Sequence, residues 1–111
     1  MTMRKPRTYS PVTVEAARLL GAAVRAARLE RRWTVEELAE RIGANHTTVR
    51  KVERGDLTVG LGVAFEAAAI VGVPLFGDDA ERRSLEAARL ADRLAVLPDR
   101  ARRPVTIDND F

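Results

Sequence analysis

Residues 34–55, TVEELAERIGANHTTVRKVERG, carry the pattern that decides the fold. Thr34 is a favoured helix N-cap residue, and Glu37, three residues later, completes the spacing of a capping box. Apolar residues then recur at helical spacing at Val35, Leu38, Ala39 and Ile42. Gly43 suits the left-handed conformation that ends many helices. The stretch therefore opens with a short helix that ends before Gly43.

A second helix is predicted directly after the first. Only Ala44 separates Gly43 from Asn45, which is another favoured N-cap residue. The helix is expected to run through Arg54 and to close at Gly55. Two helices of about two turns each, joined by a tight turn that contains glycine, form a helix-turn-helix arrangement.

The second helix has two different faces. Val49 and Val52 point to one side. The polar and basic residues are His46, Thr47, Arg50, Lys51 and Arg54. At about 100° per residue these five fall within an arc of about 140°, and none of them is acidic. Such a face is either an ordinary solvated helix surface or a surface that meets a polyanion.

The flanking sequence predicts more helix and no strand. Residues 13–31 show a helical apolar pattern at Leu20, Val24 and Ala27, and residues 1–11 resemble a basic arm that prolines interrupt. Trp33 and Leu38 stand at the positions of a hydrophobic staple. Phe65 and Phe76 are predicted to be core residues.

Composition and charge favour some classes of function and argue against others. The net charge is only +3, but the first 56 residues carry +5 and the remainder −2, which favours a polyanionic partner for the first half. With no cysteine and one histidine, we expect no cofactor, no metal site and no catalytic residues, hence no enzyme. No apolar run approaches ~18 residues, so we expect no membrane span and a cytoplasmic location.

Residues 20–76 resemble the lambda-repressor-like helix-turn-helix domain of the Xre family. The resemblance rests on the stretch from Leu38 to Gly55, LAERIGANHTTVRKVERG, which fits the family without a gap. It implies an all-α fold in which a five-helix DNA-binding domain, residues 12–77, is followed by an added C-terminal helix and tail. Leu61, Ala64, Phe65 and Ala68 match the fourth helix, Gly72 its C-cap, and residues 73–76 a short fifth helix.

The resemblance and the chemistry of DNA reading together suggest a set of site residues. The base contacts are expected from His46, Thr47 and Lys51. The phosphate contacts are expected from Thr34, Val35, Arg50 and Arg54. Val35 stands where the family often has a polar residue, so contact there would use backbone N–H groups. The family also tends to pair an arginine with the last glutamate of the recognition helix, which here are Arg28 and Glu53.

Beyond Gly77 the sequence predicts a helix and a tail. Asp78 and Glu81 have capping-box spacing. The helix should run from about residue 79 to residue 97 and stop before Pro98, so the C-terminal helical segment is assigned to residues 78–97. Its apolar stripe is Ala87, Leu90, Ala91, Leu94 and Leu97. The stripe either folds back on its own domain or shares in a dimer interface. The tail, residues 98–111, is either solvated or binds a protein through Val105, Ile107 and Phe111.

The hypothesis that follows is a sequence-specific DNA-binding transcriptional regulator, a homodimeric repressor at an operator with paired half-sites roughly 34 Å apart. Its organisation also resembles HipB-like antitoxins of toxin-antitoxin operons, which implies a HipA-like toxin as a partner. A regulator of other genes is the rival within that class. The alternative from another class is a protein-protein interaction adaptor with little DNA binding.

Overall fold

The computed structural model describes residues 7–101 and shows an all-helical chain in that range. The helices are α1 (Pro11–Glu30), α2 (Val35–Ile42), α3 (His46–Glu53), α4 (Leu61–Val71) and α5 (Ala80–Val96). No strand occurs among the described residues, so the predicted all-α class is confirmed. The chain divides into two compact units, residues 1–75 and 76–111.

Helix α2 begins and ends where its caps predict, whereas α3 begins directly after Asn45 as predicted but ends at Glu53, one residue before the predicted Arg54. The Glu37 backbone N–H donates to the Thr34 hydroxyl at 3.0 Å, and the Thr34 N–H donates to the Glu37 carboxylate at 3.1 Å. Gly43 ends α2 in the left-handed conformation at φ 68°. Asn45 caps α3 by accepting from the Thr48 N–H at 2.8 Å. The turn between the helices is thus fixed by local hydrogen bonds at both of its ends.

Helix α1 begins two residues earlier than the sequence pattern predicts. Ser10 is its N-cap and accepts a hydrogen bond from the Thr13 N–H. Pro11, which the sequence analysis assigned to the arm, is the first helical residue. Proline suits this position because its φ is already helical and its missing N–H would have no intrahelical partner there.

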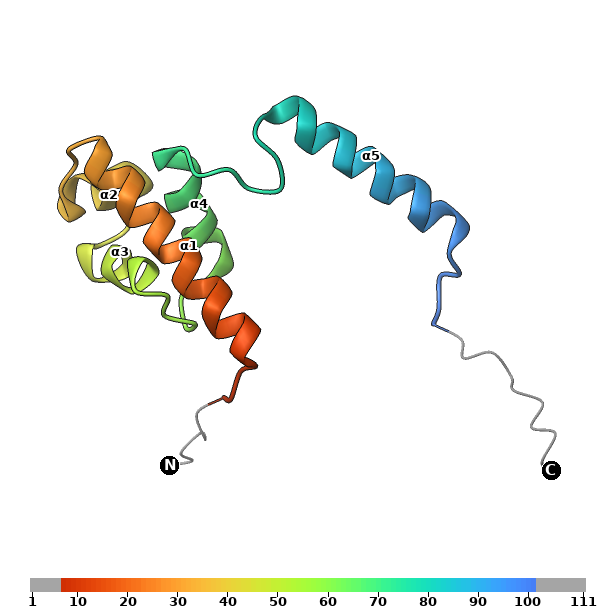
Figure 1. Cartoon of the computed structure of the whole chain (residues 1–111), viewed down its shortest axis with the longest axis horizontal. Coiled ribbons are helices and arrows are strands. Elements are labelled where there is room, and N and C mark those ends of the chain that lie inside the picture. The colour runs from red at the N-terminus through yellow and green to blue at the C-terminus, as the bar shows by residue number, and fades with distance from the viewer. Residues whose placement is uncertain (1–6, 102–111) are drawn as a thin grey trace. The chain divides into compact units, whose positions relative to one another are not determined.

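The four helices of the first unit form one bundle around a small core (Figure 1). The largest fully buried side chains come from all four of these helices: Val24, Leu38, Val49 and Val71. Trp33 and Val35 pack against this cluster from its edge, which agrees with the predicted staple around the start of α2. The core therefore holds the first turn of α2 and the valine side of α3 in place.

Gly21 allows α1 and α3 to approach closely. A Cβ atom at this position would lie 2.5 Å from the Glu53 carbonyl oxygen and would also collide with the carbonyl of Val52. Glycine inside a helix costs roughly 0.5–1 kcal/mol relative to alanine, so close packing is the compensating gain here. The end of α3 is thereby seated directly on the backbone of α1.

The segment after α4 departs from the sequence prediction in three ways. Gly72 ends α4 at φ 85°, as expected, but residues 73–74 are irregular, residues 75–79 form bends, and no short fifth helix is present there. Phe76, predicted to be core, is 78 % exposed and has a φ of 58°, because without a helix no repeating face directs it inward. Asp79, one residue later than predicted, caps α5 by accepting from the Arg82 N–H at 2.8 Å.

Candidate nucleic-acid interface

Helix α3 presents its polar face to solvent and its valines to the core. Val49 and Val52 are buried, at 0 % and 4 % exposure. On the other side His46, Thr47, Arg50 and Arg54 are exposed, and Lys51 is half-buried. The anchoring valines fix the rotation of α3 about its own axis, so this side is held outward as a surface.

The three residues expected to contact bases share this surface. His46 and Thr47 are the first two residues of α3, and Lys51 follows one turn later. An ammonium group donates to the guanine O6 and N7 atoms, and a threonine side chain donates, accepts or contacts a thymine methyl group. Their order along the helix suits insertion of its N-terminal part into a major groove.

Each of the two exposed arginines has a nearby carboxylate. The Arg50 Nη2 atom lies 4.0 Å from Glu36 Oε1 across α2 and α3, and the Arg54 Nη2 atom lies 3.6 Å from Asp56 Oδ2. Both arginine side chains are more than half exposed, and exposed pairs of this kind contribute only about 0–1 kcal/mol. Pairs this weak leave both guanidinium groups available to another anion.

At the start of α2, backbone N–H groups are more available to a phosphate than the side chains are. The Thr34 hydroxyl and the Thr34 N–H are both engaged in the capping box, and the Val35 side chain packs on the core. In the first turn of a helix the leading N–H groups have no intrahelical carbonyl, so those of Val35 and Glu36 face outward along the helix axis. Glu36 and Glu37 reduce the attraction of this end for an anion.

A bidentate ion pair between Arg28 and Glu53 joins α1 to the end of α3. The Arg28 Nε atom donates to Glu53 Oε2 at 2.6 Å and Nη2 donates to Oε1 at 3.0 Å. The third guanidinium nitrogen, Nη1, donates to the Trp33 carbonyl at 2.8 Å. Both side chains are only 8 % exposed. The hydrogen bond to Glu53 raises the pKa of Arg28, against the opposing effect of its burial.

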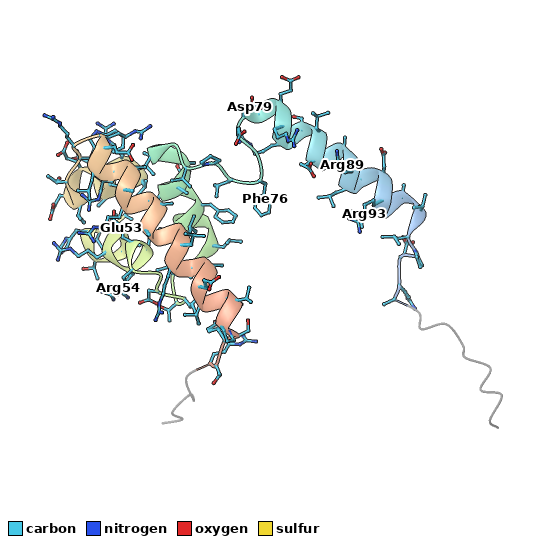
Figure 2. The ribbon with its side chains drawn as sticks, in the orientation of Figure 1. Glu53, Arg54, Phe76, Asp79, Arg89 and Arg93 are labelled. Carbon is cyan, nitrogen blue, oxygen red and sulfur yellow. The ribbon has the colours of Figure 1, made fainter. Side chains whose placement is uncertain are left out.

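The Arg28–Glu53 ion pair connects three parts of the helix-turn-helix domain. It ties the last residue of α3 to α1 and, through Trp33, to the residue that precedes the N-cap of α2. Figure 2 shows Glu53 at the end of α3, directly before the exposed Arg54. Its role is to hold the two helices of the motif in register.

Two arginines lie close to the indole ring of Trp33. The Arg41 guanidinium is 3.9 Å from the centre of the indole ring, and that of Arg31 is 5.7 Å from it. Cations over an indole face are attracted to its electron-rich surface. Arg31 is thus held near Trp33, and the indole has a packing role at the edge of the core.

Sequence reasoning missed two acidic residues beside the basic face. Glu36 approaches Arg50, and Asp56 approaches Arg54 while accepting from the Thr58 hydroxyl at 2.6 Å and the Thr58 N–H at 2.8 Å. These bonds, with the hydroxyl bond as the main cause, lower the pKa of Asp56. The Asp-x-Thr spacing is a signal for this local turn. The contact of Glu36 depends on how α2 and α3 cross.

The second unit contains the predicted stripe on α5. Leu90, Leu94 and Leu97 are at least half exposed, and no residue of α5 is buried. The tail residues Val105, Ile107 and Phe111 lie outside the described residues. Within residues 7–101, no three histidine or acidic side chains lie close enough to hold a metal ion.

The comparison with known families finds a match that begins within α1 and covers the later part of the first unit. Residues 24–77 match the family model described as Helix-turn-helix, a family of DNA-binding transcription regulators. The match covers α2, the turn, α3 and α4 entirely. Neither a curated protein nor a solved structure matches the chain significantly. None of the helices in the described range is long and apolar enough to cross a lipid bilayer.

Proposed function

Residues 24–77 belong to the helix-turn-helix family of DNA-binding regulators, and from this membership we propose that the chain is a sequence-specific transcriptional repressor that binds its operator as a dimer. In this proposal α3 enters the major groove. His46, Thr47 and Lys51 contact base edges, and Arg50 and Arg54 contact the phosphates on either side.

The observation that carries the proposal is the exposed face of α3. Its outward side chains are basic or neutral polar, and its valines anchor it to the core. A face of this composition matches the negative charge of DNA and the donor and acceptor pattern of the major groove. The first turn of α2, where Thr34 and Val35 lie, would meet the phosphate backbone through its free N–H groups.

A dimer is proposed because one short helix reads too few base pairs for specificity. Proteins that use this motif bind two half-sites about one helical turn apart. The exposed leucines of α5 give the second unit an apolar surface that a second copy could cover.

We propose a HipA-like toxin as the protein partner, with the chain acting as its antitoxin. This part of the proposal rests on the sequence of the tail, where Val105, Ile107 and Phe111 are apolar residues beyond the helix stop at Pro98. Deleting residues 104–111 should leave operator binding intact and weaken capture of the toxin. Equal capture by both chains would contradict this assignment.

The DNA-binding function is tested by selection from a pool of random duplexes with the full-length protein. We expect enrichment of a short motif that occurs twice in inverted orientation, with centres about 10 base pairs apart. A pool that stays random after several rounds would contradict the proposal and favour the adaptor function. Arg54→Glu serves as the matched variant, since it reverses one charge of the basic face without touching the core.

A further inference from the structure

Helix α5 has the residue pattern of a coiled-coil helix, which packs along its length against another helix. Apart from Arg83, the residues that return alternately after three and four positions are apolar or small, as in a heptad repeat. The positions usually called a and d are Ala80, Arg83, Ala87, Leu90, Leu94 and, at the C-cap directly after the helix, Leu97. Three leucines of this seam are 50 %, 68 % and 52 % exposed, so the seam lacks the cover that leucines at these positions normally have.

Two charged residues flank the seam on the same side. Glu86 and Arg93 are one heptad apart and both precede an a position, which makes them g residues. At about 100° per residue they lie on the leucine-rich flank of the helix. Arg89 and Arg93, which are labelled in Figure 2, are one turn apart, and the Arg89 Nη1 atom lies 3.4 Å from Glu86 Oε1.

We propose that α5 pairs with α5 of a second copy in antiparallel orientation, with Glu86 of each copy facing Arg93 of the other. The inference rests on the dimer of the proposed function and specifies how that dimer is held together. The pairing is symmetric about a two-fold axis, so both contacts form at once.

The register follows from the way antiparallel helices pack, with an a residue of one helix beside a d residue of the other. Placing Ala87 opposite Leu90 of the second copy also places Ala80 opposite Leu97. Residues 81–96 of the two helices then lie side by side, which is all but the first residue of the 17-residue α5. In this same register the g residues Glu86 and Arg93 come opposite each other. The register of greatest overlap is thus also the register of charge complementarity.

The parallel alternative is disfavoured by the same residues. It places Arg83 opposite Arg83 of the second copy inside the seam, where like charges repel. It also places Glu86 opposite the e residue Ala91, which cannot pair with a carboxylate. In the antiparallel pair Leu94 lies beside Arg83, whose aliphatic stem can cover the leucine while its guanidinium reaches water.

Charge reversal tests the proposed contacts in the full-length chain. Glu86→Arg and Arg93→Glu each replace two attractive contacts by two repulsive ones, and each should weaken the dimer about 30-fold in sedimentation equilibrium. Mixing the two variants should restore dimerisation as a heterodimer, because opposite charges then face each other at both contacts. Asp92→Arg, the same type of change on the opposite side of α5, is the matched control and should leave the dimer unchanged.

Orientation is tested with engineered cysteines, since the natural chain has none. An equimolar mixture of Ala87→Cys and Leu90→Cys chains should form a disulfide-linked heterodimer faster than either chain links to itself. Faster self-linking of both single variants would show a parallel pair and overturn the proposal.

The outcomes separate this inference from the proposed function. If Glu86→Arg and Arg93→Glu leave the dimer undiminished, the α5 pairing is wrong, and exposed apolar residues of the first unit such as Leu19 and Leu29 become the interface to test. Selection of a DNA motif by the same protein would be unaffected by that result. A chain that dimerises through α5 but selects no DNA would instead contradict the proposed function alone.

Discussion

Removal of the Glu53 carboxylate tests how the two helices of the motif are held together. In Glu53→Ala the guanidinium of the buried Arg28 loses two hydrogen bonds of 2.6 and 3.0 Å and keeps only the bond to the Trp33 carbonyl. Leaving one member of a buried pair unpartnered typically costs about 3–5 kcal/mol. For a unit of this size, 1 kcal/mol corresponds to a Tm change of about 4–8 °C, so Tm should fall by at least about 12 °C.

The assay is thermal and urea unfolding followed by the fluorescence of Trp33, the only tryptophan of the chain. Glu66→Ala removes an exposed carboxylate on α4 and, as the control, should change stability by no more than about 0.5 kcal/mol. The double variant Arg28→Met with Glu53→Leu should regain most of the loss, because no charge is then left buried.

A cost below about 1 kcal/mol for Glu53→Ala would refute this reasoning, as would a double variant no more stable than Glu53→Ala alone. Operator affinity measured well below the Tm should change little in Glu53→Ala. The pair acts on the stability of the domain, and the base contacts come from other residues.

Three further substitutions test other parts of the account. Gly21→Ala should destabilise the domain by about 1–3 kcal/mol or more in urea unfolding, because the added Cβ meets the carbonyls of α3; an unchanged midpoint would contradict the close approach. Lys51→Ala should cost about 1–3 kcal/mol of binding and relax preference at one base pair of each half-site, whereas equal loss on all duplexes would make Lys51 a phosphate contact. The bonds from Thr58 lower the pKa of Asp56, so the turn they form should be intact above the unfolded pKa of about 3.9 and should loosen as pH falls through the lower folded value. Hydrogen exchange of the Thr58 amide measures this loosening. In Asp56→Asn the turn should no longer loosen as the pH falls.

Local chemistry explains why so much of the first unit was predictable from sequence. The caps Thr34 and Asn45 and the glycine at 43 act within a few residues, so their spacing alone marks the ends of α2 and α3. The two valines of α3 similarly indicate which side of the helix meets the core. The close approach at Gly21 was not predicted, although a glycine inside a predicted helix is itself an indication of close packing.

Features that depend on three-dimensional arrangement were harder to predict. The exposure of Phe76 follows from the failure of residues 73–79 to form a helix, which their apolar sequence does not reveal. Asp78 and Asp79 are both suitable caps, and the spacing to Glu81 favoured the wrong one. The approach of Glu36 to Arg50 depends on the crossing of α2 and α3. The partner of the α5 seam lies on another molecule in our proposal, and one chain cannot display it.

In the proposed complex the basic face of α3 binds the DNA backbone while its first turn contacts bases. The most direct test is the salt dependence of affinity for the selected duplex, compared between the natural chain and the double variant Arg50→Ala with Arg54→Ala. Two arginines in each of two copies would neutralise four phosphates, so the slope of log affinity against log salt should become shallower by about 3.6 in the variant. A natural chain with a flat slope, or a variant whose slope is unchanged, would contradict the account.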